Sequence, residues 1–442
     1  MTSPALLSAT EAARAIREGR LTARELVEAC LARIAEREPE VQAWTFLDPD
    51  TERASADARD AYQRAGRPLG PLHGVPVGLK DIIDTIWMPT ENGTPLHKGR
   101  RPLGNARSVE RLGAAGAIVL GKTVTTELAF FHPGKTRNPR DPRRTPGGSS
   151  SGSAAAVADG MVPLALGSQT NGSVIRPASY CGIIGYKPTH GLISRAGMLL
   201  QSRTLDHVGL FARTVEDIAL LGDVLAGHDP LDPDTRAEDP PQLLAGLRKP
   251  MAEPALAFVR TPVWDQAEPS TRTLFEDLAA SLGERCVERE LPPEFAQAHA
   301  AHGTIMQADQ ALNYGPLYDQ DSSQLSPVMR AAIETGRKVT AVEWHRAVAL
   351  AATLRRLLLP LFADHAALLT PAAPGEAPLG LERTGNPAFC SIWSLLGLPA
   401  ISLPLLQGPD GLPVGVQLVG AWGEDAKLLR TAAWLQRRVA GS

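Results

Sequence analysis

The sequence is poor in the features that mark secreted, metal-binding and membrane proteins. It has four cysteines in 442 residues, with no Cys-x-x-Cys pair, so neither a disulfide framework nor a zinc site is predicted. It also lacks a run of about 18 apolar residues, which argues against a transmembrane helix. Its first residues lack the basic and apolar regions of a secretory signal. These absences favour a cytoplasmic protein with no membrane partner.

Positive and negative side chains are nearly balanced in number. The 45 basic and 48 acidic side chains give a net charge of −3, so no nucleic-acid partner is predicted. Apolar residues make up 43% and charged residues 21% of the chain, which is ordinary globular composition. A chain of 442 residues can hold several ordinary domains or one large α/β domain.

Helical and strand patterns alternate along the chain. Capping boxes such as Thr22-x-x-Glu25 open amphipathic helices, and short apolar runs predict buried strands. Residues 1–70 are predicted to form a mainly helical N-terminal segment, and the Asp-, Pro- and Arg-rich residues 228–250 a surface excursion. Helices are expected at about 8–18, 22–37, 51–66, 108–116, 151–158, 214–225, 269–282, 293–313, 341–362 and 425–439. Strands are expected at about 41–47, 75–80, 117–120, 164–167, 256–260, 286–291, 367–370, 400–403 and 414–419. The alternation indicates an α/β fold with a largely parallel or mixed sheet covered by helices.

The most informative stretch is 147–177, where two clusters of Gly and Ser flank an Ala-rich helix and a short apolar strand. Gly/Ser runs are usually flexible linkers, but a linker would not be followed directly by regular elements. Small residues let main chains approach closely and leave N–H groups free to bind an anion. Ser173 follows Thr170-Asn171-Gly172, a turn whose Asn and Gly tolerate positive φ. This pattern is typical of an oxyanion site around a nucleophile.

Two other motifs in the sequence do not fit their structural context. Residues 116–123 match the phosphate-binding loop letter for letter, but the four middle residues form an apolar strand pattern that would be buried. Ser150, within Gly148 to Gly152, matches the nucleophile elbow of Ser-His-Asp hydrolases. An elbow needs a buried strand before it, and residues 138–146 contain three prolines and four charges. Nucleotide binding and a Ser-His-Asp triad are therefore disfavoured.

The stretch 147–177 resembles the signature of the amidase signature family of serine hydrolases, and the resemblance extends along the chain. The further matching segments are 72–81 (Leu-His-Gly-Val-Pro-Val-Gly-Leu-Lys-Asp), 181–189, 205–209, 397–400 and 411–420. The resemblance implies one large mixed β-sheet surrounded by helices, in a single domain 1–442.

The resemblance also implies a catalytic Lys-Ser-Ser triad. Ser173 matches the family's nucleophile, Ser149 its bridging serine, which adopts a cis peptide, and Lys80 its base. A lysine acts as a base only when neutral, so its pKa must be lowered by burial. In the family, main-chain N–H groups bind the oxyanion; the corresponding residues here are Thr170, Asn171, Gly172 and Ser173.

The signature departs from the commoner family pattern at three positions. Gln169 replaces Asp, Asn171 replaces Gly, and Arg176 lies three residues after the nucleophile instead of two. The order Ser-Val-Ile-Arg-Pro resembles the malonamidase-type branch. Arg176 is either a ligand for a substrate carboxylate or a structural arginine. His132 and Lys135 are candidates for the substrate pocket, as are Ile305 to Tyr318, Phe389 and Trp393.

The expected function is hydrolysis of a small carboxamide to carboxylate and ammonia through an acyl-enzyme on Ser173. The resemblance implies no metal and no cofactor, a small-molecule amide substrate as partner, and allows a homodimer. An alternative is the amidase subunit of a tRNA-dependent amidotransferase, which supplies ammonia to a partner. A third hypothesis is a binding scaffold without activity, although all three reactive positions are present.

Overall fold

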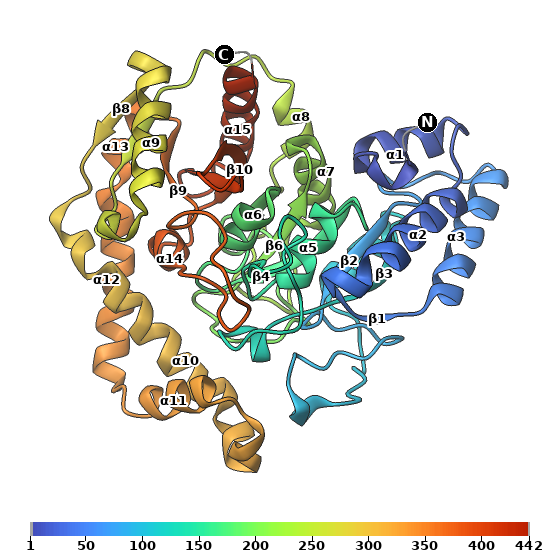
Figure 1. Cartoon of the computed structure of the whole chain (residues 1–442), viewed down its shortest axis with the longest axis horizontal. Helices are drawn as coiled ribbons and strands as arrows, with labels where there is room; N and C mark the ends of the chain where they lie inside the picture. The colour runs from blue at the N-terminus through green and yellow to red at the C-terminus, as the bar shows by residue number, and fades with distance from the viewer. Residues whose placement is uncertain (1–2, 441–442) are drawn as a thin grey trace.

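A single eleven-stranded sheet runs through the molecule (Figure 1). The computed structural model describes residues 3–440. From one edge to the other, the strands are β1 (Trp44–Leu47), β3 (Ile118–Thr123), β2 (Pro76–Lys80), β4 (Leu164–Gln169), β6 (His207–Ala212), β5 (Ile184–Lys187), β10 (Ala400–Gln407), β11 (Pro413–Val419), β9 (Ala367–Pro371), β7 (Leu256–Val259) and β8 (Cys286–Arg289). Strand β2 is parallel to both of its neighbours, β3 and β4, and β7 is parallel to β8 and β9. The other pairs are antiparallel. The predicted α/β fold with one large mixed sheet is confirmed.

Helices cover the sheet on both faces. They are α1 (Ala9–Arg17), α2 (Ala23–Val41), α3 (Pro49–Arg64), α4 (Arg107–Ala114), α5 (Ser151–Ala158), α6 (Ile175–Cys181), α7 (Val215–Leu225), α8 (Leu243–Leu247), α9 (Pro269–Leu282), α10 (Ala298–Asp321), α11 (Pro327–Gly336), α12 (Ala341–Leu357), α13 (Leu359–Asp364), α14 (Ala388–Leu395) and α15 (Asp425–Ala440). Helices α2, α5 and α6 share one apolar core with the sheet, whereas α4, α7 and α15 share another. Successive strand side chains point to opposite faces, so Ala165 lies in the first core and Leu164 and Leu166 in the second.

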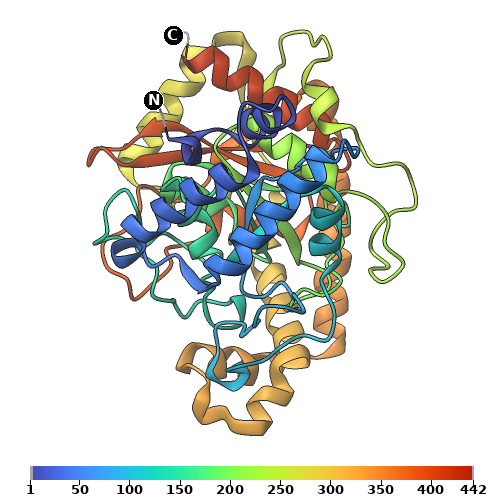
Figure 2. The ribbon, with the colours of Figure 1, turned by 90° about the vertical axis from the view of Figure 1, so that its right-hand side faces the viewer.

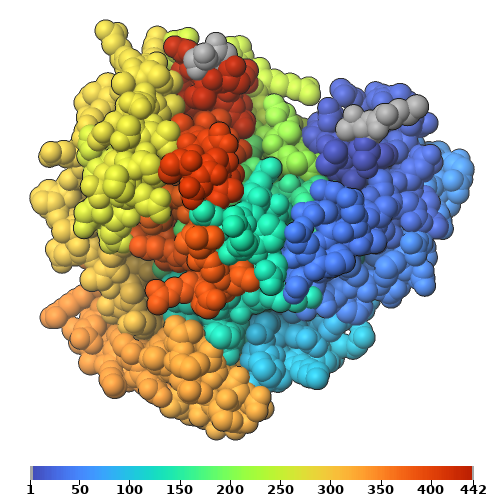
Figure 3. All heavy atoms as spheres, viewed as in Figure 1, coloured from blue at the N-terminus to red at the C-terminus, as the bar shows by residue number. Residues whose placement is uncertain are grey.

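A third apolar cluster joins α10, α11, α12 and α14. In Figure 1 these yellow and orange helices lie away from the blue N-terminal helices. In the space-filling view, the part of the chain coloured blue-green lies between the orange helices and the blue helices (Figure 3). The N-terminal segment is not wholly helical, because β1 joins the sheet as an edge strand next to β3.

The segment 228–250 stands out from the body as a yellow-green loop (Figure 2). It is nevertheless anchored at two points. The carboxylate of Asp232 accepts hydrogen bonds from the main chain and guanidinium of Arg195, and Leu243 of α8 is buried in a core. No helix within residues 3–440 is long and apolar enough to cross a membrane.

Several elements differ from the sequence prediction. Helices α6 and α14 were not predicted because every residue in them is buried, so they lack the polar face that marks an amphipathic helix. The helix predicted over 108–116 is α4, which begins at Arg107 after the N-cap Ala106 and ends at Ala114. The helix predicted over 341–362 divides at Leu358 into α12 and α13, since Pro360 in the first turn of α13 cannot continue the α12 hydrogen bonds.

Candidate active site

Lys80 lies at the C-terminal end of β2, where its side chain is fully buried. Its Nζ is 2.6 Å from Ser149 Oγ and 2.8 Å from Ser168 Oγ. Burial lowers the pKa of Lys80 well below its ordinary value, and the negative charge of Asp206 offsets only part of this effect. Burial without a bonded carboxylate therefore favours the neutral amine, which can accept a proton from one hydroxyl while it donates to the other.

Ser149 lies in the Gly/Ser cluster that precedes α5. The peptide bond between Gly148 and Ser149 is cis, and the Ser149 carbonyl accepts a hydrogen bond from the Thr126 N–H at 3.2 Å. The cluster is packed tightly, because a Cβ atom on Gly152 would lie 2.2 Å from the Ala43 carbonyl oxygen. These residues are therefore part of the core and not a linker.

Ser173 lies in the turn between β4 and α6 and is 8% exposed. Strand β4 is paired with β2 and runs parallel to it. The turn after β4 therefore lies at the same end of the strands as Lys80. Ser168, near the end of β4, contacts Lys80 and so links the end of β4 to the end of β2. The structure thus brings Lys80 and Ser149 into contact and places Ser173 at the same edge.

The turn 170–173 presents main-chain donors. Within residues 3–440, the N–H groups of Asn171, Gly172 and Ser173 have no hydrogen-bond acceptor, so they are available to a ligand. The turn does not use the positive φ that Asn171 and Gly172 would tolerate. Gly172 is required for a different reason, since a Cβ atom there would lie 2.8 Å from Pro387 Cβ.

The buried side chain of Gln169 holds the residues that follow the turn. Its Oε1 accepts hydrogen bonds from the N–H groups of Val174 and Ile175 at 2.8 and 3.0 Å, and its Nε2 donates to Ser394 Oγ at 3.0 Å. In the sequence, Gln169 is only a departure from the family pattern. Its contact with Ser394 joins residues 225 positions apart, and no local pattern could have indicated it.

Asp206 is a second group whose place in the site was missed. Its carboxylate accepts hydrogen bonds from Thr170 Oγ1 at 2.6 Å and from the N–H groups of Gln201 and Ser202 at 2.8 and 3.0 Å. Burial raises the pKa of Asp206 to about 6. The segment 205–209 was a sequence signal for the family, but it gave no indication that Asp206 would hold Thr170.

Arg176 lies behind the site and is 1% exposed. Its guanidinium donates to the carbonyl oxygens of Gly148 at 2.6 Å and Gly385 at 3.2 Å, and to Thr384 Oγ1 at 3.2 Å. This geometry favours the structural alternative over binding of a substrate carboxylate.

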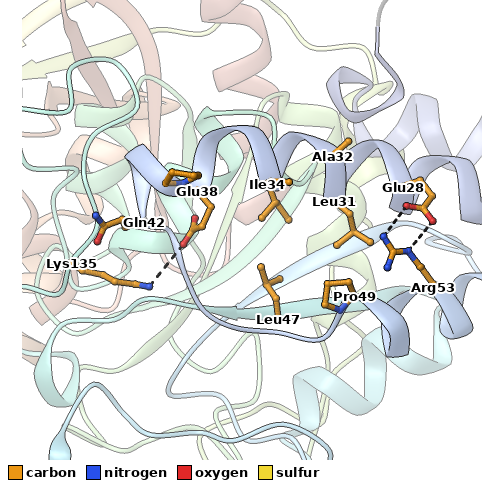
Figure 4. A pocket seen from close by; sticks show the side chains of 12 residues that line it. Glu28, Leu31, Ala32, Ile34, Glu38, Gln42, Leu47, Pro49, Arg53 and Lys135 are labelled. Carbon is orange, nitrogen blue, oxygen red and sulfur yellow. Dashed lines mark hydrogen bonds and ion pairs between the residues drawn. The ribbon is translucent and has the colours of Figure 1, made fainter.

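His132 and Lys135 are exposed. The Nζ atom of Lys135 is 4.0 Å from Glu38 Oε1 on α2. There it lines an open groove of about 830 Å³ between α2 and the segment from β1 to α3 (Figure 4). Leu31, Ile34 and Leu47 contribute apolar surface to this groove, which includes none of the predicted catalytic residues.

The two disfavoured motifs have structural roles. Lys122, in the sequence that matches a phosphate-binding loop, is buried in β3 and donates to the Ile83 carbonyl oxygen and to Thr90 Oγ1. The hydroxyl of Ser150, the centre of the apparent elbow, is buried and bonds the main chain of Ser168. Within residues 3–440, His, Cys, Asp and Glu side chains form no cluster that could hold a metal ion.

Comparison with known proteins agrees with this fold. Residues 25–429 match the family model for amidases. The chain is 36% identical over 470 residues to a glutamyl-tRNA(Gln) amidotransferase subunit of Chloroflexus aurantiacus, covering 98% of this chain and 96% of that one. Its structure is similar to that of the native peptide amidase from Stenotrophomonas maltophilia, with a TM-score of 0.84, 30% identity, and coverage of 98% and 97%. A 6-aminohexanoate cyclic dimer hydrolase gives a TM-score of 0.87 at 28% identity, with the same coverage.

A mixed sheet that places a buried lysine against a serine hydroxyl, with this match to amidase structures, defines a hydrolase of C–N amide bonds. The chain belongs to the amidase family, in which the Lys-Ser-Ser triad is typical.

Proposed function

We propose that the protein hydrolyses a small carboxamide to a carboxylate and ammonia through an acyl-enzyme on Ser173. The observation that carries this proposal is the 2.6 Å contact between Lys80 Nζ and Ser149 Oγ in a fully buried site. A neutral amine beside a hydroxyl can accept its proton, and that hydroxyl can in turn accept the proton of a nucleophile.

In the acylation step, the Ser173 oxygen attacks the substrate carbonyl carbon while its proton passes to Ser149, whose own proton passes to Lys80. The carbonyl oxygen becomes an oxyanion, which the N–H groups of Thr170, Asn171, Gly172 and Ser173 stabilise. Lys80 then returns a proton through Ser149 to the amide nitrogen, the C–N bond breaks, and ammonia leaves. Water attacks the acyl-enzyme by the same route, which releases the carboxylate and restores the Ser173 hydroxyl.

The substrate class is set by what surrounds Ser173. The order Ser-Val-Ile-Arg-Pro motivates a malonamidase-type substrate with a second carboxylate, but the guanidinium of Arg176 is already bonded to main-chain carbonyls. A small neutral carboxamide therefore agrees better with the geometry. We propose that the protein acts on it in the cytoplasm without metal or cofactor.

A second candidate function is the amidase subunit of a tRNA-dependent amidotransferase. The observation in its favour is the 36% identity to the Chloroflexus aurantiacus amidotransferase protein over 96% of that chain. In that function, ammonia passes to a partner protein. The departures at Gln169, Asn171 and Arg176 favour the independent amidase.

The test of the proposed function is Ser173→Ala. This variant should fold with an unchanged Tm and lose at least about 1,000-fold in kcat, because no nucleophile remains. A fluorophosphonate probe should label the wild type and fail to label this variant. Ser150→Ala is the matched control and should still be labelled. Full activity in Ser173→Ala would refute the proposal, and an unlabelled, inactive wild type would favour a binding scaffold.

A further inference from the structure

The turn 170–173 consists of successive peptide units that each carry a candidate oxyanion donor on one side and a carbonyl on the other. In a trans peptide unit the C=O and the following N–H lie in one plane and point in opposite directions. A donor that holds the Thr170 carbonyl therefore fixes the direction of the Asn171 N–H. The Asn171 carbonyl fixes the Gly172 N–H in the same way.

Each of these carbonyls is held by a donor on the side away from the site. The Thr170 carbonyl accepts from His302 Nε2 at 3.0 Å, the Asn171 carbonyl from Ser394 Oγ at 2.6 Å, and the Gly172 carbonyl from the Arg176 N–H at 3.1 Å. The last bond is local, because its donor lies in the first turn of α6. The first two come from α10 and α14, which lie far along the chain from the signature.

The protonation state of His302 follows from its partner. A carbonyl oxygen only accepts hydrogen bonds, so Nε2 carries the proton at this contact. The ring is 2% exposed, and burial lowers the pKa of His302 to about 4. His302 is therefore a neutral donor at physiological pH, and it brings no positive charge close to the turn.

The direction of the Ser394 hydroxyl is fixed by the same reasoning. Its single proton goes to the Asn171 carbonyl, so Ser394 Oγ accepts the hydrogen bond from Gln169 Nε2. Since Gln169 Oε1 accepts from the N–H groups of Val174 and Ile175, position 169 must accept and donate at once. An amide does both, whereas a carboxylate can only accept.

We propose that His302 and Ser394 are positioning residues that aim the Asn171 and Gly172 N–H groups at the oxyanion by holding the opposite side of each peptide unit. They touch no reacting atom. Their hydrogen bonds also polarise the two peptide units, which strengthens the N–H groups as donors. The inference rests on the proposed function, because it assigns these N–H groups to an oxyanion.

The chain offers a matched control on the same helix. Ser391 lies one turn before Ser394 in α14 and donates to the side-chain Oδ1 of Asn171 at 2.6 Å. It touches the same residue as Ser394 but holds no peptide unit of the turn. Ser391→Ala should therefore leave kcat within about threefold of wild type, whereas Ser394→Ala should not.

The experiment measures kcat and KM for a primary amide that the wild type hydrolyses, the second-order rate of inactivation by a fluorophosphonate, and Tm. Ser394→Ala and His302→Leu should each lower kcat by about 10- to 100-fold, less than the loss typical of a deleted oxyanion donor. KM should change by less than about threefold, and the inactivation rate should fall in parallel with kcat. Ser394→Thr and His302→Gln retain a donor and should recover most of both rates.

The outcomes separate the inference from the proposed function. Wild-type kcat and inactivation rates in Ser394→Ala and His302→Leu would overturn the inference while Ser173→Ala still abolished turnover. Equal losses in Ser391→Ala and Ser394→Ala, or no rescue by the donor-retaining variants, would also overturn it, because general damage to α14 or α10 would then explain the result. An active Ser173→Ala would instead overturn the proposed function itself.

Discussion

At Lys80, the proposed role as a base and the stability of the fold make opposite demands on one amine. The buried side chain is favoured as a neutral base, with its pKa lowered by the loss of water around it. In the unfolded chain the same amine has its ordinary pKa of about 10.4. Between the two pKa values the unfolded state binds one more proton than the folded state, so the free energy of unfolding rises with pH in this window.

This difference predicts how Lys80→Met will behave. The variant cannot titrate at position 80, so the stability of the wild type relative to the variant should increase as pH rises from the lowered pKa of Lys80 toward its ordinary value in the unfolded chain, about 10.4. Urea denaturation of both proteins at several pH values measures it. Lys338→Met, at an exposed lysine, is the control and should show no such trend. A difference that stays constant with pH would show that Lys80 is charged in the folded protein.

The same pKa predicts the acid limb of activity. Protonation of Lys80 removes the base, so kcat/KM should fall as pH drops through its lowered pKa and should reach a plateau above it. A pH–rate profile of the wild type measures this limb. An activity that increases toward acidic pH would contradict Lys80 as the base.

Arg176 leads to a prediction about substrate selectivity. Arg176→Leu removes the donors to the carbonyl oxygens of Gly148 and Gly385, and each buried acceptor left alone costs about 1–3 kcal/mol. We expect a lower Tm and equal proportional losses in kcat/KM for neutral amides and for amides with a second carboxylate. A loss confined to the acidic amides would instead assign Arg176 to substrate binding.

At the scale of elements, the signature depends on a close approach between α5 and the main chain next to β1 and β3. A Cβ atom on Gly152 would lie 2.2 Å from the Ala43 carbonyl oxygen and 2.4 Å from the Val124 nitrogen, and neither backbone group can move freely. Gly113 provides the opposite case in another helix, α4, where nothing lies within 4 Å of an added Cβ atom.

These two glycines make a matched pair. Gly152→Ala should lower the free energy of unfolding by about 1–3 kcal/mol and should also lower kcat, since α5 begins two residues after Ser149. Gly113→Ala should leave kcat unchanged and raise stability by about 0.4–1 kcal/mol, because alanine restricts the unfolded chain more than glycine does and the last turn of α4 has room for its Cβ atom. Thermal and urea denaturation with a kinetic assay test both. Wild-type stability and kcat in Gly152→Ala would show that the start of α5 is loosely packed.

The elements also show what a sequence can predict. Helices α5 and α9 have the predicted bounds, because small-residue packing and a clear amphipathic pattern mark them. Helices α6 and α14 lack any such pattern, as all their residues are buried. The Lys80, Ser149 and Ser173 positions follow from local motifs, whereas Gln169, His302 and Ser394 act through contacts between distant segments. Those contacts depend on packing that no local pattern records.

At the scale of the whole molecule, the sheet order decides which motifs meet. Strand β4 pairs with β2 although β3 lies between them in the sequence, and this places the end of β2 beside the turn that carries Ser173. The alternation of helices and strands predicted the mixed sheet but not this order, since the order depends on which strands pair across long separations.

The independent amidase and the amidotransferase component differ in assembly. We expect the purified chain alone to hydrolyse a primary amide, with no tRNA and no second protein present. Size-exclusion chromatography of untagged protein from its native host measures the assembly state. An assay of the eluted protein against a panel of primary amides measures its activity. Co-elution with a larger partner and activity only in that complex would support the amidotransferase function.

The proposed reacting residues and the side chains proposed to hold the turn come from different parts of the chain. Lys80, Ser149 and Ser173 belong to the first half, whereas His302 and Ser394 follow much later. On a ribosome, the reactive serine therefore emerges long before the helices that complete its surroundings. If those helices aim the turn as proposed, the growing polypeptide reacts more slowly than the finished enzyme until its C-terminal part has folded, and amides around it are attacked less often.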